Sequence, residues 1–249
     1  MTLKKAYQTL ILSIMLMVAV VLLYAFDVTK LDLPWGMTGF ALATVMSLFS
    51  VILAIHTARH AKEVNRPGFL FKYRFEFLDW LTFLSVSLMA IFMVFMFVAL
   101  PSDVKHSSMN PTLYSGDRVV VYHFNYTPER NDIVVTYMLD YIEDEYYVKR
   151  VFGMPGDQIT FISIDTIHYS IWINGEKAVS TSGITYLVQQ SGIDEMTSSM
   201  TNGVLNDGFY IILGDNANGS TDSRSFGAVH EEDIVGKVIL RLWPFGGVS

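Results

Sequence analysis

Three long runs without a charged residue dominate the first hundred residues of this 249-residue chain. Each of them, Ala6–Phe26, Trp35–Ile55 and Trp80–Leu100, is 21 residues long. At about 1.5 Å per residue, a helix of that length crosses a hydrocarbon layer roughly 30 Å thick. A buried helix of a soluble domain would be shorter and would show a polar face. The runs therefore predict an anchor of three transmembrane helices, residues 1–102, followed by one globular domain, residues 103–249.

The basic residues around the runs predict how the helices are oriented. The N-terminus carries Lys4 and Lys5, and the short first connection has only Lys30. Five basic residues lie in the second connection: Arg59, Lys62, Arg66, Lys72 and Arg74. Positive charge favours the cytoplasmic side, so the N-terminus is predicted inside and the globular domain on the outer face of the cytoplasmic membrane. The first run is predicted to be an uncleaved anchor, because it is long for a signal peptide and no small-x-small site follows it.

Charge and composition exclude several functional classes. Residues 1–100 carry a net charge of +3, and residues 101–249 a net charge of −10. An acidic domain is a poor nucleic-acid binder, so no such partner is predicted. The chain has no cysteine, which excludes disulfides and thiolate nucleophiles. His56 and His60 have a metal-binding spacing but lack a third ligand nearby, so neither a metal nor a cofactor is predicted. No pattern indicates an oligomeric state.

The residues after Arg118 predict a predominantly β domain, because short β-branched and aromatic runs alternate with turn signals. Asn174-Gly175 predicts a hairpin turn, and residues 154–157 another turn. The polar stretch Ser180–Asn206 predicts a long surface excursion with one irregular strand near Ile184–Val188. No helix longer than about three turns is predicted. The predicted strands are Val119–Phe124, Asp132–Tyr137, Tyr146–Val151, Ile159–Ile164, Ser170–Ile173, Phe209–Leu213 and Val235–Trp243.

Ser108 and Lys149 are the candidate nucleophile and base. A serine hydroxyl is a weak nucleophile until a base takes its proton. A lysine can do so when it is neutral, which requires its pKa to fall from about 10.4, and burial has that effect. Taken alone, a lysine in a strand is more often a solvated surface residue. Lys149 lies among Tyr, Val and Phe residues, so we expect it to be buried, while its neighbour Arg150 points to the opposite face and stays solvated.

Four motifs follow one another in the second part of the chain, and the closing segments 234–237 and 242–244 extend the pattern. They are Ser108-Met109-x-Pro111-Thr112-Leu113, Gly116-Asp117-Arg118-Val119, Lys149-Arg150-Val151-x-Gly153-x-Pro155-Gly156-Asp157 and Gly214-Asp215-Asn216-x-x-x-Ser220-x-Asp222-Ser223-Arg224-x-x-Gly227. In this order they closely resemble the type I signal peptidases, or leader peptidases, over the whole outer domain. The resemblance implies a membrane-bound Ser-Lys protease with a signal-peptidase-like fold of coiled, mixed or antiparallel sheets.

The resemblance also implies roles for the central residues. Ser108 matches the nucleophile, and its backbone N–H is expected in the oxyanion hole. Lys149 matches the general base, which returns the proton to the leaving amine. Ser220 matches a serine that hydrogen-bonds and orients the lysine. His106 departs from the pattern, because some members carry a hydroxyl residue there. Either backbone donors suffice or His106 donates instead; its use as a base is disfavoured because Lys149 is present.

Three further residues match supporting positions of the family. Asp222 and Arg224 match a pair that holds the loop near the site, and Asp215 matches a structural acid. Alone, Asp222 and Arg224 are equally consistent with an exposed ion pair, and the serines of this segment with ordinary turns. Many members have Arg-Asp where this chain has Ala217-Asn218, which alters the charge pairing of the loop.

The position of Ser108 suggests the substrate. Ser108 lies eight residues after Leu100, and eight extended residues reach at most about 28 Å. The site is therefore expected at the outer membrane–water interface, with the lipid bilayer and the signal peptides of exported preproteins as partners. The resemblance implies small residues at the first and third positions before the cut. We expect shallow apolar pockets around Ser107–Met109 and Val148–Phe152, and a substrate that adds as a strand along an exposed edge.

Two other functional classes remain as alternatives. The chain could be a catalytically idle membrane module that binds signal sequences, although such a module has no need of a buried neutral lysine. It could also be a self-cleaving Ser-Lys regulator, similar in fold to the SOS-repressor proteases. Three predicted spans and the lack of a DNA-binding segment disfavour that alternative.

Overall fold

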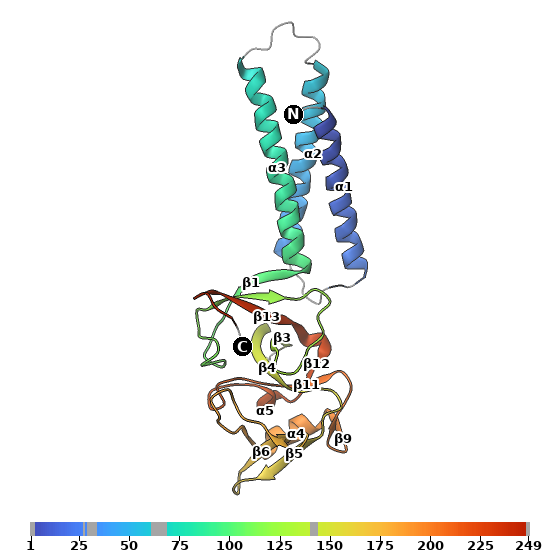
Figure 1. Ribbon diagram of the computed structural model, residues 1–249. Helices are drawn as coiled ribbons and strands as arrows, with labels where there is room; N and C mark the ends of the chain where they lie inside the picture. Colours follow the sequence, from blue (N-terminus) through green and yellow to red (C-terminus); the bar gives the residue numbers. More distant parts are fainter. Residues whose placement is uncertain (1–2, 27, 29–33, 61–68, 140–143, 248–249) are drawn as a thin grey trace. The chain divides into compact units, whose positions relative to one another are not determined.

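The structure is a computed structural model, and it describes the chain except residues 1–2, 27, 29–33, 61–68, 140–143 and 248–249. Two compact units make up the chain, Met1–Val98 and Ala99–Ser249 (Figure 1). The first unit is helical, and the second consists mainly of strands. The division between them falls inside the third uncharged run.

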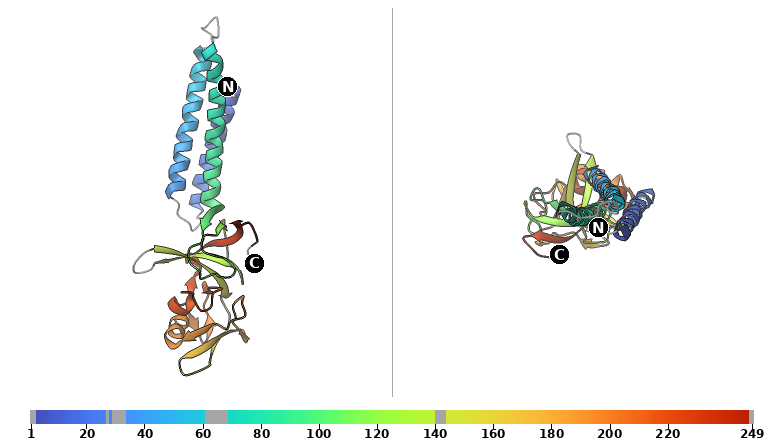
Figure 2. Two further views of the ribbon diagram at one scale, coloured as in Figure 1. Left: turned by 90° about the vertical axis from the view of Figure 1, so that its left-hand side faces the viewer. Right: turned by 90° about the horizontal axis from the view of Figure 1, so that it is seen from above.

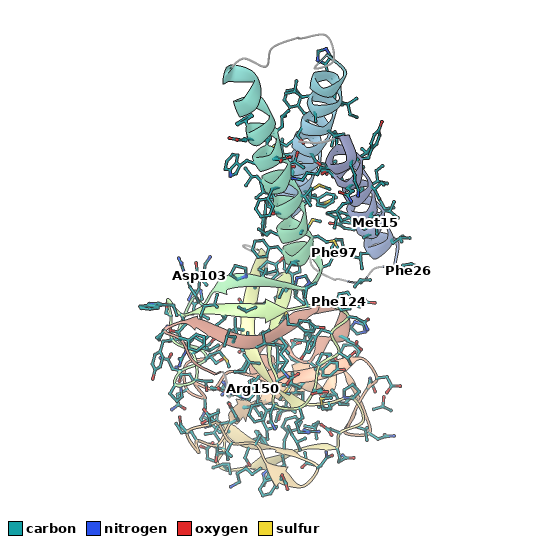
Figure 3. The ribbon with its side chains drawn as sticks, turned by 45° about the horizontal axis from the view of Figure 1, so that its top comes forward. Met15, Phe26, Phe97, Asp103, Phe124 and Arg150 are labelled. Carbon is teal, nitrogen blue, oxygen red and sulfur yellow. The ribbon has the colours of Figure 1, made fainter. Side chains whose placement is uncertain are left out.

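Three long helices form the first unit: α1 (Leu3–Ala25), α2 (Pro34–His60) and α3 (Phe69–Phe97). Each contains a stretch of 22 or 23 residues that is long and apolar enough to cross a membrane, as predicted. Apolar side chains project outward from the helices, and Met15 on α1 is 62% exposed (Figure 3). The side chains of the basic residues in the second connection lie outside the described residues.

Hydroxyl side chains link the helices inside this unit. Ser13 Oγ on α1 and Ser47 Oγ on α2 lie 2.6 Å apart. Thr82 on α3 donates to Ser50 Oγ on α2 at 3.0 Å. All four residues are buried. Between transmembrane helices such a hydrogen bond contributes about 0.6 kcal/mol on average, so this network helps to hold the three helices together.

A seven-stranded sheet forms the main part of the second unit, in the order β1-β2-β13-β3-β4-β11-β12. Every neighbouring pair is antiparallel. The predicted predominantly β, antiparallel architecture is therefore confirmed. The strands are β1 (Ala99–Asp103), β2 (Arg118–Tyr122), β3 (Ile133–Leu139), β4 (Asp144–Gly153), β11 (Phe209–Leu213), β12 (Val229–His230) and β13 (Ile234–Trp243).

The predicted helix over Trp80–Leu100 is wrong at its C-terminal end. The helix α3 ends at Phe97, and Leu100 already belongs to β1, where it lies opposite Val121 on β2. The backbone at Leu100 therefore pairs in the sheet, and Pro101 directly after it disfavours helical backbone at that position. Uncharged composition alone cannot separate these last residues from the span.

A smaller sheet packs in the same unit, and β1 and this sheet lie at opposite ends of the unit (Figures 1 and 2). Its β6–β7 hairpin turns at Asn174-Gly175, as predicted, and both turn residues have positive φ, of 53° and 82°. Glycine adopts that conformation without steric cost. The strands are β5 (Ile159–Ser163), β6 (His168–Ile173), β7 (Glu176–Lys177) and β8 (Leu187–Gln189), and the remaining elements are α4 (Gln190–Thr197), β9 (Met200–Thr201), β10 (Val204–Leu205), α5 (Ser223–Phe226) and the short 3₁₀ helix Glu231–Asp233.

All seven predicted strands are present, each within two residues of its expected ends. The interpretation of Ser180–Asn206 as a surface excursion is wrong. This segment holds β8, the two-turn helix α4, β9 and β10, and it buries Tyr186, Met196 and Leu205 almost completely. Most of its apolar side chains pack into the core of the small sheet, while most of the polar residues that suggested a loop are exposed.

Candidate active site

Ser108 and Lys149 meet inside the second unit. Ser108 lies in the turns between β1 and β2, and Lys149 lies on β4. Lys149 Nζ is 3.1 Å from Ser108 Oγ and also 3.1 Å from Val148 O. Ser108 is half-buried, whereas only 1% of Lys149 is exposed. A hydroxyl that solvent reaches thus lies against an amine that solvent does not reach.

The burial of Lys149 follows from its place in the sheet. Strand β4 is an inner strand between β3 and β11, and Lys149 lies opposite Val134, which is itself fully buried. The amine lies 5.0 Å from the centre of the Tyr147 ring. Burial among apolar side chains penalises the charged form of an amine, whereas the face of the Tyr147 ring attracts an ammonium and offsets part of that penalty.

Arg150 corrects one expectation from the sequence, because it is buried rather than solvated. Only 7% of it is exposed. Its Nε and Nη2 atoms donate to the two carboxylate oxygens of Asp215, both at 2.8 Å, and Nη1 donates to Asn131 O. The hydrogen bonds with Asp215 raise the pKa of Arg150. The opposite face of β4 is therefore also packed, and Asp215 supplies the compensating charge.

Asp215 connects this ion pair to the segment that carries Ser108. It is 1% exposed, and besides Arg150 it accepts a hydrogen bond from Thr112 Oγ1. Thr112 lies four residues after Ser108, within the first sequence motif. The sequence singled out the motif but no role for this threonine, and its partner, the buried carboxylate of Asp215, becomes visible only in the tertiary structure.

Ser220 lies close to Ser108 but does not hydrogen-bond Lys149. A Cβ atom on Gly214 would overlap both Ser108 O and Ser220 Oγ, so only this glycine separates them. Ser220 Oγ is buried and has no hydrogen-bond partner among the described residues. The hydrogen bond from Ser220 to Lys149 that the resemblance implies is not formed in this structure.

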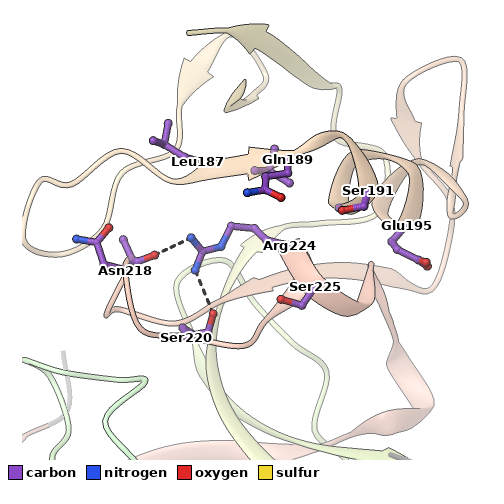
Figure 4. Close-up of a pocket in the computed structure, with 11 residues that line it drawn as sticks. Leu187, Gln189, Ser191, Glu195, Asn218, Ser220, Arg224 and Ser225 are labelled. Atoms are coloured by element: carbon purple, nitrogen blue, oxygen red, sulfur yellow. Dashed lines mark hydrogen bonds between the residues drawn. The ribbon is translucent and has the colours of Figure 1, made fainter. Parts of the chain in front are cut away.

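Asp222 and Arg224 form a buried pair, so the alternative of an exposed ion pair is wrong. Arg224 Nε and Nη2 donate to the two carboxylate oxygens of Asp222, both at 2.8 Å, and the Asp222 side chain is fully buried. Arg224 also donates to Ala217 O at 2.7 Å and to Ser220 O at 3.5 Å (Figure 4). The second oxygen of Asp222 accepts from the Gly214 amide. The pair therefore holds the Gly214–Ser220 loop at both ends.

Asn216 and Tyr186 take part in the site, although the sequence assigned them no role. The Asn216 amide donates to Ser108 O at 3.0 Å, and its side chain donates to Ser107 O at 3.2 Å. The Tyr186 hydroxyl donates to Gly214 O at 2.8 Å. Asn216 lies in a motif and could have been singled out, whereas Tyr186 lies in the segment mistaken for a surface loop.

Two further features lie near Ser108 and Ser220, the residue His106 and a cavity. His106 is exposed and has a left-handed backbone, with φ of 69°. A cavity of about 490 Å³ opens on the far side of the Ala217–Ser220 loop, between that loop, β8 and α4 (Figure 4). Arg224, Gln189 and Glu195 are among the residues that line it.

Comparisons with known proteins agree with the motifs. A family model described as signal peptidase, peptidase S26, matches residues 77–243. Signal peptidase IB of Staphylococcus aureus is 34% identical over 183 residues, which cover 68% of this chain and 91% of that protein. Signal peptidase I of Bacillus caldolyticus is 33% identical over 176 residues, which cover 67% and 90%. Among solved structures, a signal peptidase I from Enterococcus faecalis V583 is 24% identical, with a TM-score of 0.31, and covers 45% of this chain and 97% of that one.

Proposed function

The chain belongs to the signal peptidases of the peptidase S26 family, and on this premise we propose that it is a membrane-bound serine endopeptidase that removes N-terminal signal peptides from exported preproteins. The observation that carries the proposal is the 3.1 Å separation between Ser108 Oγ and the buried Lys149 Nζ. That pair meets the geometric requirement for a nucleophile and its base. No cofactor takes part in the proposed reaction.

The proposed reaction begins when Lys149 takes the proton of the Ser108 hydroxyl. Ser108 Oγ then attacks the carbonyl carbon of the bond to be cut. The same amine passes the proton to the leaving nitrogen, and water releases the acylated serine in a second, similar step. The lysine must be neutral to begin, and its burial favours the neutral form. Activity is therefore expected to fall toward acid pH.

The backbone of Ser108 is suited to hold the oxyanion of the intermediate. Its amide makes no hydrogen bond to another described residue, so it remains available to a substrate oxygen. Loss of one such donor typically costs roughly 100- to 1,000-fold in rate. We assign supporting roles to the Arg150–Asp215 and Asp222–Arg224 pairs, which hold the segments around the nucleophile. We also propose that the Ser220 hydroxyl orients Lys149 during the reaction, although in this structure it hydrogen-bonds no described residue.

The proposed substrate follows from the family and from the short connection to the last helix. Ser108 is the eleventh residue after Phe97, where α3 ends. A cut site close to the membrane surface is typical of a preprotein whose apolar signal segment still lies in the bilayer. We propose an outward-facing catalytic unit with the N-terminus inside, as the charge pattern predicts.

The test is a processing assay on a preprotein with an Ala-x-Ala cut site, using the full chain in detergent micelles across pH 6–10. Ser108→Ala and Lys149→Ala should each lower kcat by more than about 1,000-fold. The exposed residues Ser182 and Lys177 provide matched controls, and Ser182→Ala and Lys177→Ala should cut as the wild type does. Retained processing in either active-site variant would refute the mechanism.

The same assay separates the two alternative functions. An idle signal-sequence-binding module would bind the preprotein without cutting it, and a serine-directed acylating inhibitor would not label Ser108. A self-cleaving regulator would cut its own chain but leave an added preprotein intact.

A further inference from the structure

Tyr186 is a fully buried residue in the segment that the sequence predicted to lie on the surface. Its ring meets the Phe152 ring edge-on at 5.1 Å between centroids, and the guanidinium of Arg224 lies 5.2 Å from its centre. The ring is therefore held between an aromatic core residue and one half of the Asp222–Arg224 pair. Its hydroxyl is directed at the backbone of the site, where it donates to Gly214 O at 2.8 Å.

Gly214 lies between the Tyr186 hydroxyl and the backbone of Ser108. Its amide donates to Asp222 Oδ2 at 3.0 Å, so both polar groups of its backbone are anchored by buried side chains. A single added carbon on Gly214 would overlap Ser108 O and Ser220 Oγ. The backbone at Gly214 therefore lies directly against the nucleophile, and a shift of this residue is transmitted to Ser108.

Two residues further on, Asn216 holds the nucleophile segment directly. Its amide donates to Ser108 O at 3.0 Å, and its side chain donates to Ser107 O at 3.2 Å. The peptide groups before and after the Cα of Ser108 are thus both held by one residue, Asn216. The position of that segment determines where the Ser108 hydroxyl lies relative to the amine of Lys149.

We propose that Tyr186 is a positioning residue for the peptidase reaction, because its hydroxyl holds the Gly214–Asn216 segment against the backbone of Ser108. The inference rests on the proposed function of Ser108 as the nucleophile. Tyr186 touches neither the substrate nor the reacting atoms, and it acts through Gly214 and Asn216.

The protonation of Tyr186 suits this role. Burial, and after it the carboxylates of Asp215 and Asp222, raise the pKa of Tyr186 above that of an ordinary tyrosine. The phenol therefore stays protonated, and remains a hydrogen-bond donor, throughout the pH range in which a serine peptidase works.

The variant Tyr186→Phe removes the hydroxyl and keeps the ring between Phe152 and Arg224. In the full chain in micelles we expect kcat for an Ala-x-Ala preprotein to fall roughly 10- to 100-fold, the range that a misplaced reacting group produces. The KM should change little, because no substrate contact is lost. Tyr126→Phe is the matched control, since the Tyr126 hydroxyl also donates to a described partner, Asp132, at 2.7 Å. That control should retain the wild-type kcat.

Hydrogen exchange of the same two variants gives a readout that does not depend on activity. Tyr186→Phe should speed exchange of the Asn216 amide, and Tyr126→Phe should not. Unchanged exchange in Tyr186→Phe would overturn the inference even if kcat fell. Unchanged kcat with faster exchange would also overturn it, as would a loss of activity that only matches a loss of folded protein by thermal unfolding. If the wild type cuts no preprotein, the proposed function fails, and the exchange result alone decides whether Tyr186 holds the segment.

Discussion

The substitution Gly214→Ala tests whether Ser108, the proposed nucleophile, depends on the segment that packs against it. The new Cβ atom would lie 2.5 Å from Ser108 O and 2.6 Å from Ser220 Cβ, whereas ordinary contacts are 3.4–4 Å. Ser108 O is a backbone atom and cannot rotate away as a flexible side chain does. Either the Ser108 backbone or the Gly214 segment must therefore move by about 1 Å.

Two magnitudes follow from that displacement. Overpacking of a buried site by one carbon costs about 1–3 kcal/mol of unfolding free energy. A folded domain typically has about 5–15 kcal/mol, so the variant should fold. A displacement of about 1 Å at a reacting group can cost roughly 100-fold in rate. We therefore expect a fall in kcat far larger than the loss of stability alone would produce.

The assay is preprotein processing with thermal unfolding measured on the same samples. Gly247→Ala is the matched control, because nothing lies within 4 Å of a Cβ at that position. It should leave both kcat and the melting temperature unchanged. A Gly214→Ala enzyme that retains the wild-type kcat would refute the reasoning, because the nucleophile would then tolerate the displacement that the packing imposes.

Two further predictions concern buried carboxylates of the second unit. Burial tends to raise the pKa of Asp157, but hydrogen bonds from a backbone amide, Arg130 and Asn174 outweigh it and lower the pKa below 3.8. The ionised Asp157 carboxylate therefore stabilises the folded state above about pH 4, and this contribution is lost as the pH falls through the lowered pKa. The difference in melting temperature between the wild type and Asp157→Asn should accordingly shrink between pH 7 and pH 3. Asp215→Ala leaves the buried guanidinium of Arg150 without its carboxylate and should lower the free energy of unfolding, measured with denaturant, by about 3–5 kcal/mol. A decrease of less than about 1 kcal/mol would contradict this prediction.

Much of the fold could be predicted because its signals are local. The uncharged runs predicted three helices, and alternating β-branched and aromatic residues predicted seven strands to within two residues. The prediction of a surface excursion at Ser180–Asn206 was wrong because the composition of this segment is that of a loop. Its helix α4 has only two turns, and side chains such as Tyr186 are buried by contacts with distant strands, which no local pattern records.

The motif residues of the candidate site could be predicted from the sequence, but not all of their contacts. Motif order was enough to single out Ser108, Lys149, Asp215 and the Asp222–Arg224 pair, but not the pairing of Asp215 with Arg150. Solvation of Arg150 was predicted wrongly, because strand alternation says only that neighbouring side chains point apart and not that one face is open. Its burial depends on Asp215, which lies 65 residues away in the sequence.

The sequence by itself determined that this chain can span a membrane three times, that its second part is β-rich, and that it carries the signal-peptidase motifs. These properties depend on composition, alternation and short-range order along the chain. Only the tertiary structure decided which groups touch: the amine of Lys149 and the hydroxyl of Ser108, the carboxylate of Asp215 and Arg150, and the hydroxyl of Tyr186 and Gly214 O. Such contacts join residues far apart in the chain, and their distances depend on strand register and core packing rather than on any local preference.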